Sequence, residues 1–323
     1  MTRLVIVAPN WLGDAVLALP AIADVRRAWP DARITVAARQ PVASLFSMVP
    51  EVDDVIDHRV ARGPAAFDTA LLLPNSFRSA LDVARARIPQ RWGYKSDGRG
   101  WLLTRKVPPA PDGTHQVDSY QHLVDALGFP NGAKEPRLEV APALRAASAE
   151  LLATAGWDGA TPLAALAPGA AFGASKRWPP EYFADLVRAL SNDGVRSVLV
   201  GSAADQPGAR EIEIALGHDR SLLMNLVGRT DVPTLAGLFT HVRALVGNDS
   251  GAVHMAASIG VPVTAVFGPT DERLTAPRAL TSHTVLTNPV WCRPCMLREC
   301  PLDHECMRGV SADSVAGAMR RIL

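Results

Sequence analysis

Asp14 is the first residue whose type and position could serve chemistry. It follows Gly13 in the segment NWLGDAVLALP (10–20), directly after the apolar run RLVIVAP (3–9). An acid here is typical of a helix cap or first turn, where it contributes about 1 kcal/mol, but Gly13 would also let the backbone approach a ligand closely. No G-x-G-x-x-G pattern follows, so a dinucleotide cofactor is poorly supported.

A second candidate is the loop APGAAFGASKRWP (167–179). It follows an apolar run and combines glycines with the basic residue Lys176, so its backbone N–H groups and its cation could cradle a phosphate. An ordinary turn with a solvated lysine is the alternative. The spacing G-x-x-x-x-G-K-[ST] is absent, which argues against ATP hydrolysis of the P-loop kind.

A third candidate lies in VGNDSGAVHMAASIGVPVTAVFGPTD (246–271), which has the pattern of a strand, a polar turn, a helix of small residues and a second strand. Asn248, Asp249 and Ser250 are all good N-cap residues, but one helix needs only one cap. The surplus indicates a ligand, and the free N–H groups of the helix suit a diphosphate. Asp249 could accept from a sugar hydroxyl. His254 lies one turn further on, although a helix histidine is more often a packing residue.

The four cysteines lie together near the end of the chain. Their spacing, C-x2-C-x4-C-x5-C with His304 nearby, could hold a structural zinc ion, but only one CxxC pair is present. Reduced thiols and disulfides are the alternatives, and a role in transfer chemistry is not expected. The residues are Cys292, Cys295, Cys300 and Cys306.

Short apolar runs that alternate with helical periodicity must position these candidates. Continuous apolar strands are buried on both faces, which predicts parallel sheets covered by helices. Ligands bind such sheets at the carboxyl ends of the strands, where the candidates lie. The runs are at 3–9, 32–38, 54–60, 69–75, 163–169, 197–203, 243–249 and 262–268.

The series breaks once, at the Gly/Pro-punctuated segment WDGATP (157–162). We therefore expect a linker there and two α/β domains, 1–157 and 158–323. A terminal helix with Ser311 as its N-cap should close the chain.

Composition sets the broad class. With 323 residues, 48% hydrophobic and 20% charged, the chain can form two domains with their own cores. The net charge of +1 gives no support to nucleic-acid binding. No apolar run reaches the roughly 18 residues of a membrane span, and no signal peptide is recognisable, so a cytoplasmic location is expected.

Five motifs occur in order from the first strand to the last cysteine: NWLGDAVLALPAI, LLLPNSFRSA, PGAAFGASKRWP, NDSGAVHMAASIGVPVTAVFGPTDE and CRPCMLRECPLDHECM. In this combination the chain resembles the bacterial ADP-heptose:lipopolysaccharide heptosyltransferases, most of all heptosyltransferase II. The resemblance implies the GT-B fold, in which two Rossmann-like doubly wound parallel-sheet domains face each other across a cleft. The acceptor would bind the N-terminal domain and the sugar donor the C-terminal domain.

The resemblance also implies roles for single residues in an inverting transfer. Asp14 would be the general base, while Lys176 and the helix that begins near Asp249 would stabilise the leaving ADP. No cofactor or divalent metal would then be required. Asp205 is the nearest candidate for an acid on the donor ribose. The implied donor-binding residues are Gly169, Ala170, Ala171, Phe172, Lys176, Asp249, Ser250, Gly251 and His254.

On the acceptor side, the family uses a heptosyl-Kdo-lipid A type of acceptor. The segment 85–106 contains seven basic residues and the single acid Asp97, which suits a phosphate-rich acceptor or an anionic membrane face; a solvated basic surface is the alternative. We expect a monomer at the inner face of the cytoplasmic membrane. The candidate acceptor residues are Gly13, Asn75, Ser76, Arg78 and Arg99, with His115 and Tyr120 as rim residues.

Two other classes of function compete with this interpretation. Another GT-B glycosyltransferase or a sugar-nucleotide epimerase would share the phosphate loop but prefer a different nucleotide, such as UDP. A binding module organised by the cysteines would not be an enzyme, and the phosphate loop argues against it.

Overall fold

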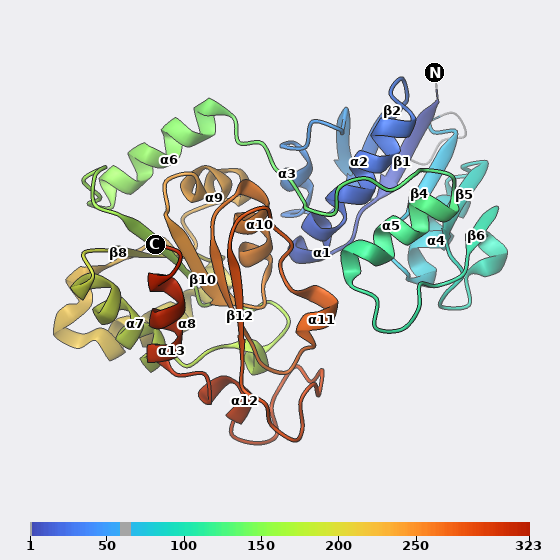
Figure 1. The fold of residues 1–323 in the computed structure, drawn as a ribbon. Helices are drawn as coiled ribbons and strands as arrows, with labels where there is room; N and C mark the ends of the chain where they lie inside the picture. The colour runs from blue at the N-terminus through green and yellow to red at the C-terminus, as the bar shows by residue number, and fades with distance from the viewer. Residues whose placement is uncertain (1, 59–65) are drawn as a thin grey trace. The chain divides into compact units, whose positions relative to one another are not determined.

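The structure, a computed structural model, describes residues 2–58 and 66–323. The chain divides into two compact units, Met1–Glu139 and Val140–Leu323, and each contains one six-stranded sheet (Figure 1). Every strand pairing among the described residues is parallel. The predicted class, two doubly wound parallel α/β units, is therefore confirmed.

The N-terminal unit has the sheet order β3-β2-β1-β4-β5-β6. The order reverses between β1 and β4, so this pair marks the topological switch point. The strands are β1 (Arg3–Val7), β2 (Arg33–Ala38), β3 (Asp54–Asp57), β4 (Thr69–Leu72), β5 (Gln90–Tyr94) and β6 (Arg105–Val107). The helices are α1 (Leu12–Leu17), α2 (Leu19–Ala28), α3 (Ala43–Phe46), α4 (Phe77–Arg85), η1 (Gly100–Leu102) and α5 (Gln116–Ala126).

The C-terminal unit repeats this plan with the order β12-β11-β10-β7-β8-β9. Its switch point lies between β7 and β10. The strands are β7 (Leu163–Ala167), β8 (Arg196–Leu199), β9 (Leu223–Asn225), β10 (Ala244–Asn248), β11 (Val263–Phe267) and β12 (His283–Thr287). The helices are α6 (Pro142–Thr154), η2 (Ala174–Lys176), α7 (Pro180–Asn192), η3 (Ala203–Asp205), α8 (Gln206–Leu216), η4 (Gly217–Leu222), α9 (Val232–Phe239), α10 (Gly251–Ile259), α11 (Glu272–Thr275), α12 (Glu305–Arg308) and α13 (Ala312–Arg320).

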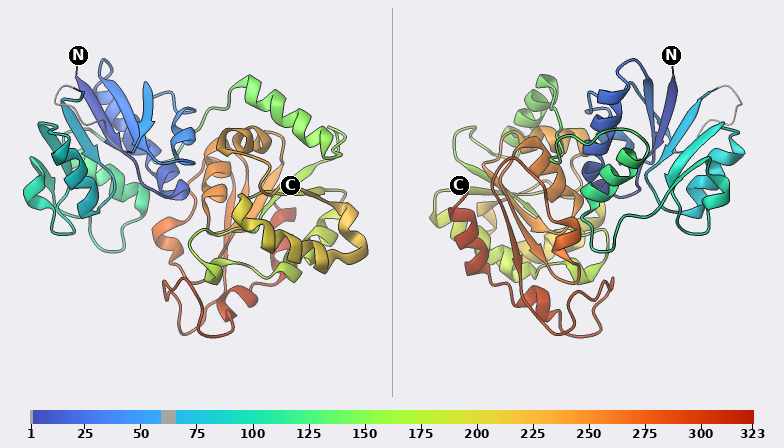
Figure 2. Two further views of the ribbon diagram at one scale, coloured as in Figure 1. Left: turned by 180° about the vertical axis from the view of Figure 1, so that it is seen from behind. Right: turned by 45° about the vertical axis from the view of Figure 1, so that its right-hand side comes forward.

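The central strands are apolar throughout because both of their faces are covered (Figure 2). In β1, Val5 and Val7 pack with Ala80 and Val83 of α4. The intervening Ile6 is fully buried as well, and it points to the opposite face because side chains alternate along a strand. This is why the sequence shows continuous rather than alternating apolar runs.

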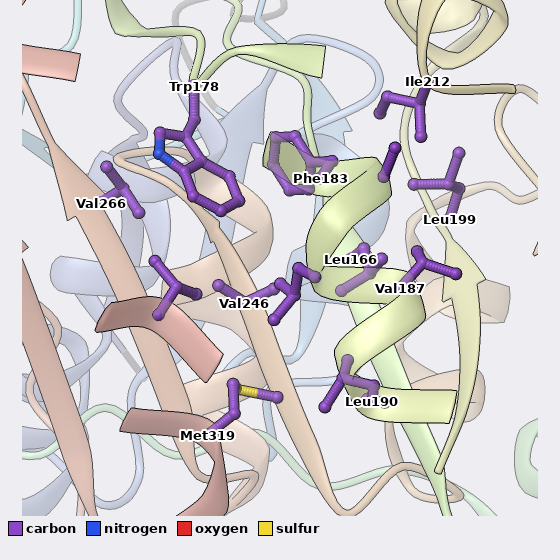
Figure 3. Packing of buried hydrophobic residues seen from close by; sticks show 14 of the residues in the cluster. Leu166, Trp178, Phe183, Val187, Leu190, Leu199, Ile212, Val246, Val266 and Met319 are labelled. Atoms are coloured by element: carbon purple, nitrogen blue, oxygen red, sulfur yellow. The ribbon is translucent and has the colours of Figure 1, made fainter. Parts of the chain in front are cut away.

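The core of the C-terminal unit is built around Trp178, which is 1% exposed. Figure 3 shows this ring near Val246 and Val266 of the sheet, with Phe183 and Leu190 on α7. The indole Nε1 donates to Val310 O over 2.8 Å, so the one polar atom of the ring is satisfied inside the core. Trp178 thereby fixes the chain at the end of the predicted phosphate loop.

The boundary between the units lies between residues 139 and 140, whereas the sequence predicts it at 157/158. The difference concerns α6, which packs on α9. Ser148 Oγ donates to Thr234 O over 2.9 Å, and Gly237 approaches α6 so closely that a Cβ would lie 2.4 Å from Leu144 O. Helix α6 therefore belongs to the C-terminal unit.

The structure contains strands that the sequence analysis did not identify. They are β5, β6, β9 and β12, and their sequences are QRWGY, RKV, LMN and HTVLT. β6, β9 and β12 are edge strands and β5 is the neighbour of one; burial is incomplete at an edge, so no apolar run is needed there. Residues 59 and 60 of the predicted run 54–60 lie outside the described residues. The Ser311 cap is confirmed, since its side chain accepts from Ser314 N.

Candidate active site

The two segments predicted for a sugar donor meet at the switch point of the C-terminal unit. β7 and β10 are neighbours there, and the loops that follow them carry Lys176 and Asp249. Lys176 Nζ forms an ion pair with Asp249 Oδ2, and the two side chains are only 12% and 6% exposed. The crevice beside the carboxyl ends of such strands is the usual ligand site of this fold class.

Asp249 is held by further contacts on both carboxylate oxygens. Thr270 Oγ1 donates to Oδ2 over 2.7 Å, and His254 Nε2 lies 3.8 Å from Oδ1. Burial alone would raise the pKa of Asp249, but the neighbouring His254 and the Lys176 cation outweigh it and lower the pKa to about 2. The carboxylate is therefore ionised at neutral pH, and it balances the charge of Lys176.

Two buried polar atoms at the start of α10 have no hydrogen-bond partner among the described residues. They are Ser250 Oγ and His254 Nδ1. Ser250 is the N-cap residue of α10, but its side chain makes no capping bond. Buried polar groups are normally satisfied, so these atoms and the free N–H groups of the first turn indicate a place for a polar ligand.

Asn248 has a structural role, which explains why three cap-type residues occur together. Its Nδ2 donates to Pro168 O over 2.7 Å, and its Oδ1 accepts from Trp178 N over 3.0 Å. The side chain is fully buried. Asn248 therefore bridges the two ends of the loop 168–178 and holds that loop beside α10.

The loop after β7 contains the predicted residues Gly169, Ala170, Ala171 and Phe172. Its backbone runs against Asp205, because a Cβ on Gly169 would lie 2.4 Å from Asp205 Cγ. The Asp205 carboxylate accepts from Ser202 N and Oγ, over 2.9 and 2.8 Å, in a capping box. A side chain at position 169 would displace the Asp205 carboxylate, so the acid suggested for the ribose lies directly beside this loop.

In the N-terminal unit, Asp14 lies in the first turn of α1, and Trp11 is the N-cap residue. Of the two helix positions expected for this acid, cap or first turn, the structure shows the first turn, where a carboxylate complements the helix dipole. The carboxylate is close to Tyr120 of α5. Burial and the negative charge of Asp14 raise the pKa of the Tyr120 phenol well above its usual value, so that hydroxyl stays protonated at any physiological pH.

Gly13, Asn75 and Ser76 flank the switch point of the N-terminal unit, at the carboxyl ends of β1 and β4. Ser76 caps α4 through a bond from Ser79 N. Arg78 lies in the first turn of α4, where it pairs with Asp82 over 2.9 Å and is 75% exposed. Gly13, Asn75, Ser76 and Arg78 thus all follow the carboxyl ends of the two central strands, β1 and β4.

Arg99 requires a correction, because its side chain is 0% exposed. Its Nε donates to Tyr94 O over 3.1 Å, and its Nη1 donates to Ser76 O over 3.1 Å and to Ser79 Oγ over 3.0 Å. Burial lowers its pKa to about 10, although Asp97 partly opposes the shift. Arg99 therefore supports the loop after β4 from inside the unit, and its buried Nη2 has no hydrogen-bond partner among the described residues.

The basic segment instead exposes other cations at the end of β5. A cavity of about 380 Å³ is lined by Lys95, Lys106 and the 72% exposed Trp101, among other residues. Neither lysine forms an ion pair with the described residues. Asp97 is engaged through its Oδ2, which accepts from Phe77 N over 2.6 Å. This combination of cations and an aromatic ring suits an anionic, amphipathic partner.

The residues 292–306, which we call the cysteine segment, hold four free thiols. Burial raises the pKa of Cys306, and the other three thiols raise it further when they ionise. Among the described residues, no group of three His, Cys, Asp or Glu side chains is placed to hold a metal ion. The zinc ion suggested by the spacing stays a prediction.

Thr270, Arg293 and Arg298 were not identified from the sequence. Thr270 follows β11, the neighbour of β10, and bonds to Asp249; its place after an apolar run could have indicated it. Arg293 and Arg298 lie in the cysteine segment, where no sequence pattern marks either arginine as part of a site. Arg298 lies 5.5 Å from the centre of the Phe172 ring, a contact that no local pattern encodes.

The model of glycosyltransferase family 9 (heptosyltransferase) matches residues 55–305. The chain belongs to this family. The lipopolysaccharide heptosyltransferase 2 of Salmonella typhimurium is 31% identical over 296 residues, which is 85% of each chain. The lipooligosaccharide heptosyltransferase 2 of Haemophilus ducreyi is 32% identical over 302 residues, 85% of this chain and 86% of the relative.

Solved structures agree with this membership. The structure of Escherichia coli ADP-heptose lipopolysaccharide heptosyltransferase II superposes with a TM-score of 0.85 at 28% identity and covers 100% of this chain and 98% of its own. The expected GT-B fold of a glycosyltransferase is thereby confirmed. No helix in residues 2–58 and 66–323 of this glycosyltransferase is long and apolar enough to span a membrane.

Proposed function

We propose that this glycosyltransferase moves a heptose from ADP-heptose to the inner core of lipopolysaccharide, as the second heptose, in the manner of heptosyltransferase II. The relatives with this name support the proposal at 30–32% identity over 85% of the chain. The single observation that carries it is the buried Lys176–Asp249 pair beside the unsatisfied polar atoms of α10.

The donor would bind the C-terminal unit. Its diphosphate would lie at the N-terminus of α10, near Lys176, where the N–H groups and the cation stabilise the charge that grows on departing ADP. The backbone of 169–172 would contact the phosphates, since Ala171 and Phe172 offer no hydroxyl. Protein groups supply this stabilisation in the proposal, so no divalent metal or other cofactor takes part.

The acceptor would react in the N-terminal unit. The Asp14 carboxylate would take the proton of the acceptor hydroxyl as its oxygen bonds to the anomeric carbon of the heptose. The bond from that carbon to the diphosphate breaks in the same displacement, so the anomeric configuration inverts and ADP leaves with the electron pair. Tyr120 would help to hold Asp14 in place.

The protein would work at the cytoplasmic face of the inner membrane, as a monomer without nucleic acid. The acceptor is a glycolipid, and Lys95, Lys106 and Trp101 offer cations and an exposed indole at the end of β5. Each lysine near an anionic surface contributes about 1 kcal/mol. Sedimentation with anionic vesicles should fall for Trp101→Ala, and equal sedimentation with neutral vesicles would contradict membrane docking by charge.

A transfer assay tests the central proposal. ADP-heptose and a core acceptor carrying one heptose should give a product with two heptoses and free ADP. ADP should bind and compete with the donor. Preferential binding of UDP would favour another nucleotide-sugar transferase or an epimerase instead, and the absence of any transfer to the core acceptor would contradict the proposal.

A further inference from the structure

The Lys176–Asp249 pair leaves the donor site short of positive charge for a diphosphate. Asp249 is ionised at neutral pH, because its pKa is lowered to about 2, and it is paired with Lys176. The buried pair therefore has little net charge. The diphosphate of a nucleotide sugar carries about two negative charges, so Lys176 cannot balance it while Asp249 keeps its own negative charge.

Arg298 shares an aromatic ring with Lys176. Its Cζ lies 5.5 Å from the centroid of the Phe172 ring, and Lys176 Nζ lies 4.7 Å from the same centroid. The two charges are thus within roughly one Debye length, about 10 Å at 0.1 M salt. Arg298 is exposed and forms no ion pair or side-chain hydrogen bond with the described residues, so its five donors are available.

The backbone around Arg298 is fixed directly to the phosphate loop. Ser175 N donates to Arg298 O over 3.1 Å, and Ser175 Oγ donates to Leu297 O over 2.6 Å. Gly173 approaches the same carbonyl so closely that a Cβ would lie 2.2 Å from Arg298 O. Residue 298 and the residues that precede Lys176 therefore form one bonded unit.

A second set of bonds joins the cysteine segment to the other side of the donor site. Arg293 Nε donates to Gly268 O over 2.6 Å, and its Nη2 donates to Thr270 O over 3.1 Å. Thr270 in turn donates to Asp249. The cysteine segment thus contacts the loop that carries Lys176 and the loop after β11, whose Thr270 bonds to Asp249.

We propose that Arg298 is a second diphosphate-binding cation of the donor site and that Ser175 positions it through the cysteine segment. The inference rests on the proposed function, because it takes a nucleoside diphosphate or its sugar ester as the ligand. A guanidinium can donate two parallel bonds to phosphate oxygens. Lys176 and Arg298 both make cation–π contacts with the Phe172 ring, which helps to hold the two cations near each other.

Calorimetric titration of the full-length protein with ADP, AMP and adenosine tests the proposal. Arg298→Gln should weaken ADP binding by about tenfold or more, the size of a lost hydrogen bond to a charged group, and leave adenosine binding unchanged. Arg298→Lys should retain most of the affinity for ADP. Arg321→Gln is the matched control, since it removes an equal charge from an exposed arginine at the end of α13.

A double-mutant cycle separates positioning from folding. Ser175→Ala should weaken ADP binding in the parent protein but have little further effect in Arg298→Gln, because the hydroxyl acts through Arg298. Equal ADP affinity in Arg298→Gln and parent would overturn the inference, as would a loss that is the same for adenosine. If the parent itself does not bind ADP, the proposed function has failed rather than this inference.

Discussion

The two units share one strand order but prepare their sites differently. In the C-terminal unit the candidate residues are buried and bonded to one another, as Lys176, Asp249 and Thr270 show. In the N-terminal unit the exposed cations Lys95 and Lys106 line an open cavity. A shared topology thus determines where a ligand binds, at the carboxyl ends of the strands. It does not determine whether the binding side chains are already held in place by bonds to one another.

The difference suits two kinds of ligand. A small diphosphate gains most from cations and N–H groups held in place before it arrives, because little side-chain entropy is lost on binding. A large glycolipid can be held by many weaker surface contacts, each sensitive to salt. Variants in one unit should therefore affect one substrate only, and the predictions below test that separation.

The largest effect should follow from Asp14→Asn, which removes the proposed base. Turnover should fall on the order of 10²-fold or more, since the acceptor hydroxyl has no group to take its proton. ADP affinity, measured by titration, should stay near that of the parent protein. Near-normal turnover would remove Asp14 from the chemistry, and a parallel loss of ADP affinity would break the separation between the units.

Lys176→Ala should have the next largest effect, on the donor. A charge-assisted contact contributes about 1.5 to 3 kcal/mol, so both ADP and ADP-heptose should bind roughly 10- to 100-fold more weakly. The measurement is donor titration alongside the transfer rate. Lys95→Ala, a lysine of the N-terminal unit, is the control and should leave donor affinity unchanged. Damage to acceptor affinity alone would contradict the assignment of Lys176.

The buried carboxylate should also make stability depend on pH. The folded-state pKa of Asp249 is about 2, below its ordinary value of 3.8, so its contribution to stability is present above the unfolded pKa and is lost as the pH falls toward 2. It amounts to roughly 2 kcal/mol of unfolding free energy. Denaturant unfolding at steps between pH 5 and pH 2 should show this loss in the parent.

Asp249→Asn provides the comparison for that experiment. The variant cannot ionise at this position, so its unfolding free energy should change less between the same two pH values. An identical pH dependence in both proteins would show that other carboxylates account for the acid sensitivity. Ionised Asp249 would then contribute no more to the free energy of unfolding than the exposed acids of the N-terminal unit do.

Alkylation of the thiols should have a smaller effect on ADP affinity, because the cysteine segment contacts the loop that carries Lys176. Cys306 is buried and its pKa is raised, so it should react with N-ethylmaleimide after Cys292, Cys295 and Cys300, as mass spectrometry of partly labelled protein can show. Labelled protein should bind ADP a few-fold more weakly. Unchanged ADP affinity after complete labelling would show that the segment does not support the donor site.

Chelation of metal ions should have the smallest effect on transfer activity. In the proposed mechanism, Lys176 and the N-terminus of α10 stabilise the leaving diphosphate without a metal ion, so activity should persist in EDTA throughout an assay. If the cysteines bind zinc, removal of the zinc should lower thermal stability before it lowers the rate of the chemical step. Immediate loss of turnover that Mg²⁺ alone restores would contradict the proposed role of Lys176.

The sequence predicted the central strands well because burial on both faces leaves a strong local signal. Lys176 and Asp249 were identified for a related reason, since each follows such a strand. The sequence could not predict that Arg99 is buried, because an arginine that donates to backbone carbonyls inside a domain looks the same in sequence as an exposed one. It also missed α6's partner α9 and the contact of Arg298 with Phe172, which join residues far apart in the chain.

The position of α6 has a consequence for how such a chain can be recombined. Because this helix is bonded to α9 and follows the boundary at residues 139 and 140, each unit is encoded by one uninterrupted stretch. A single crossover before Pro142 would exchange the complete C-terminal unit between relatives. A junction at 157 would instead pair a foreign α6 with the native α9, and the close fit at Gly237 would select against most such hybrids.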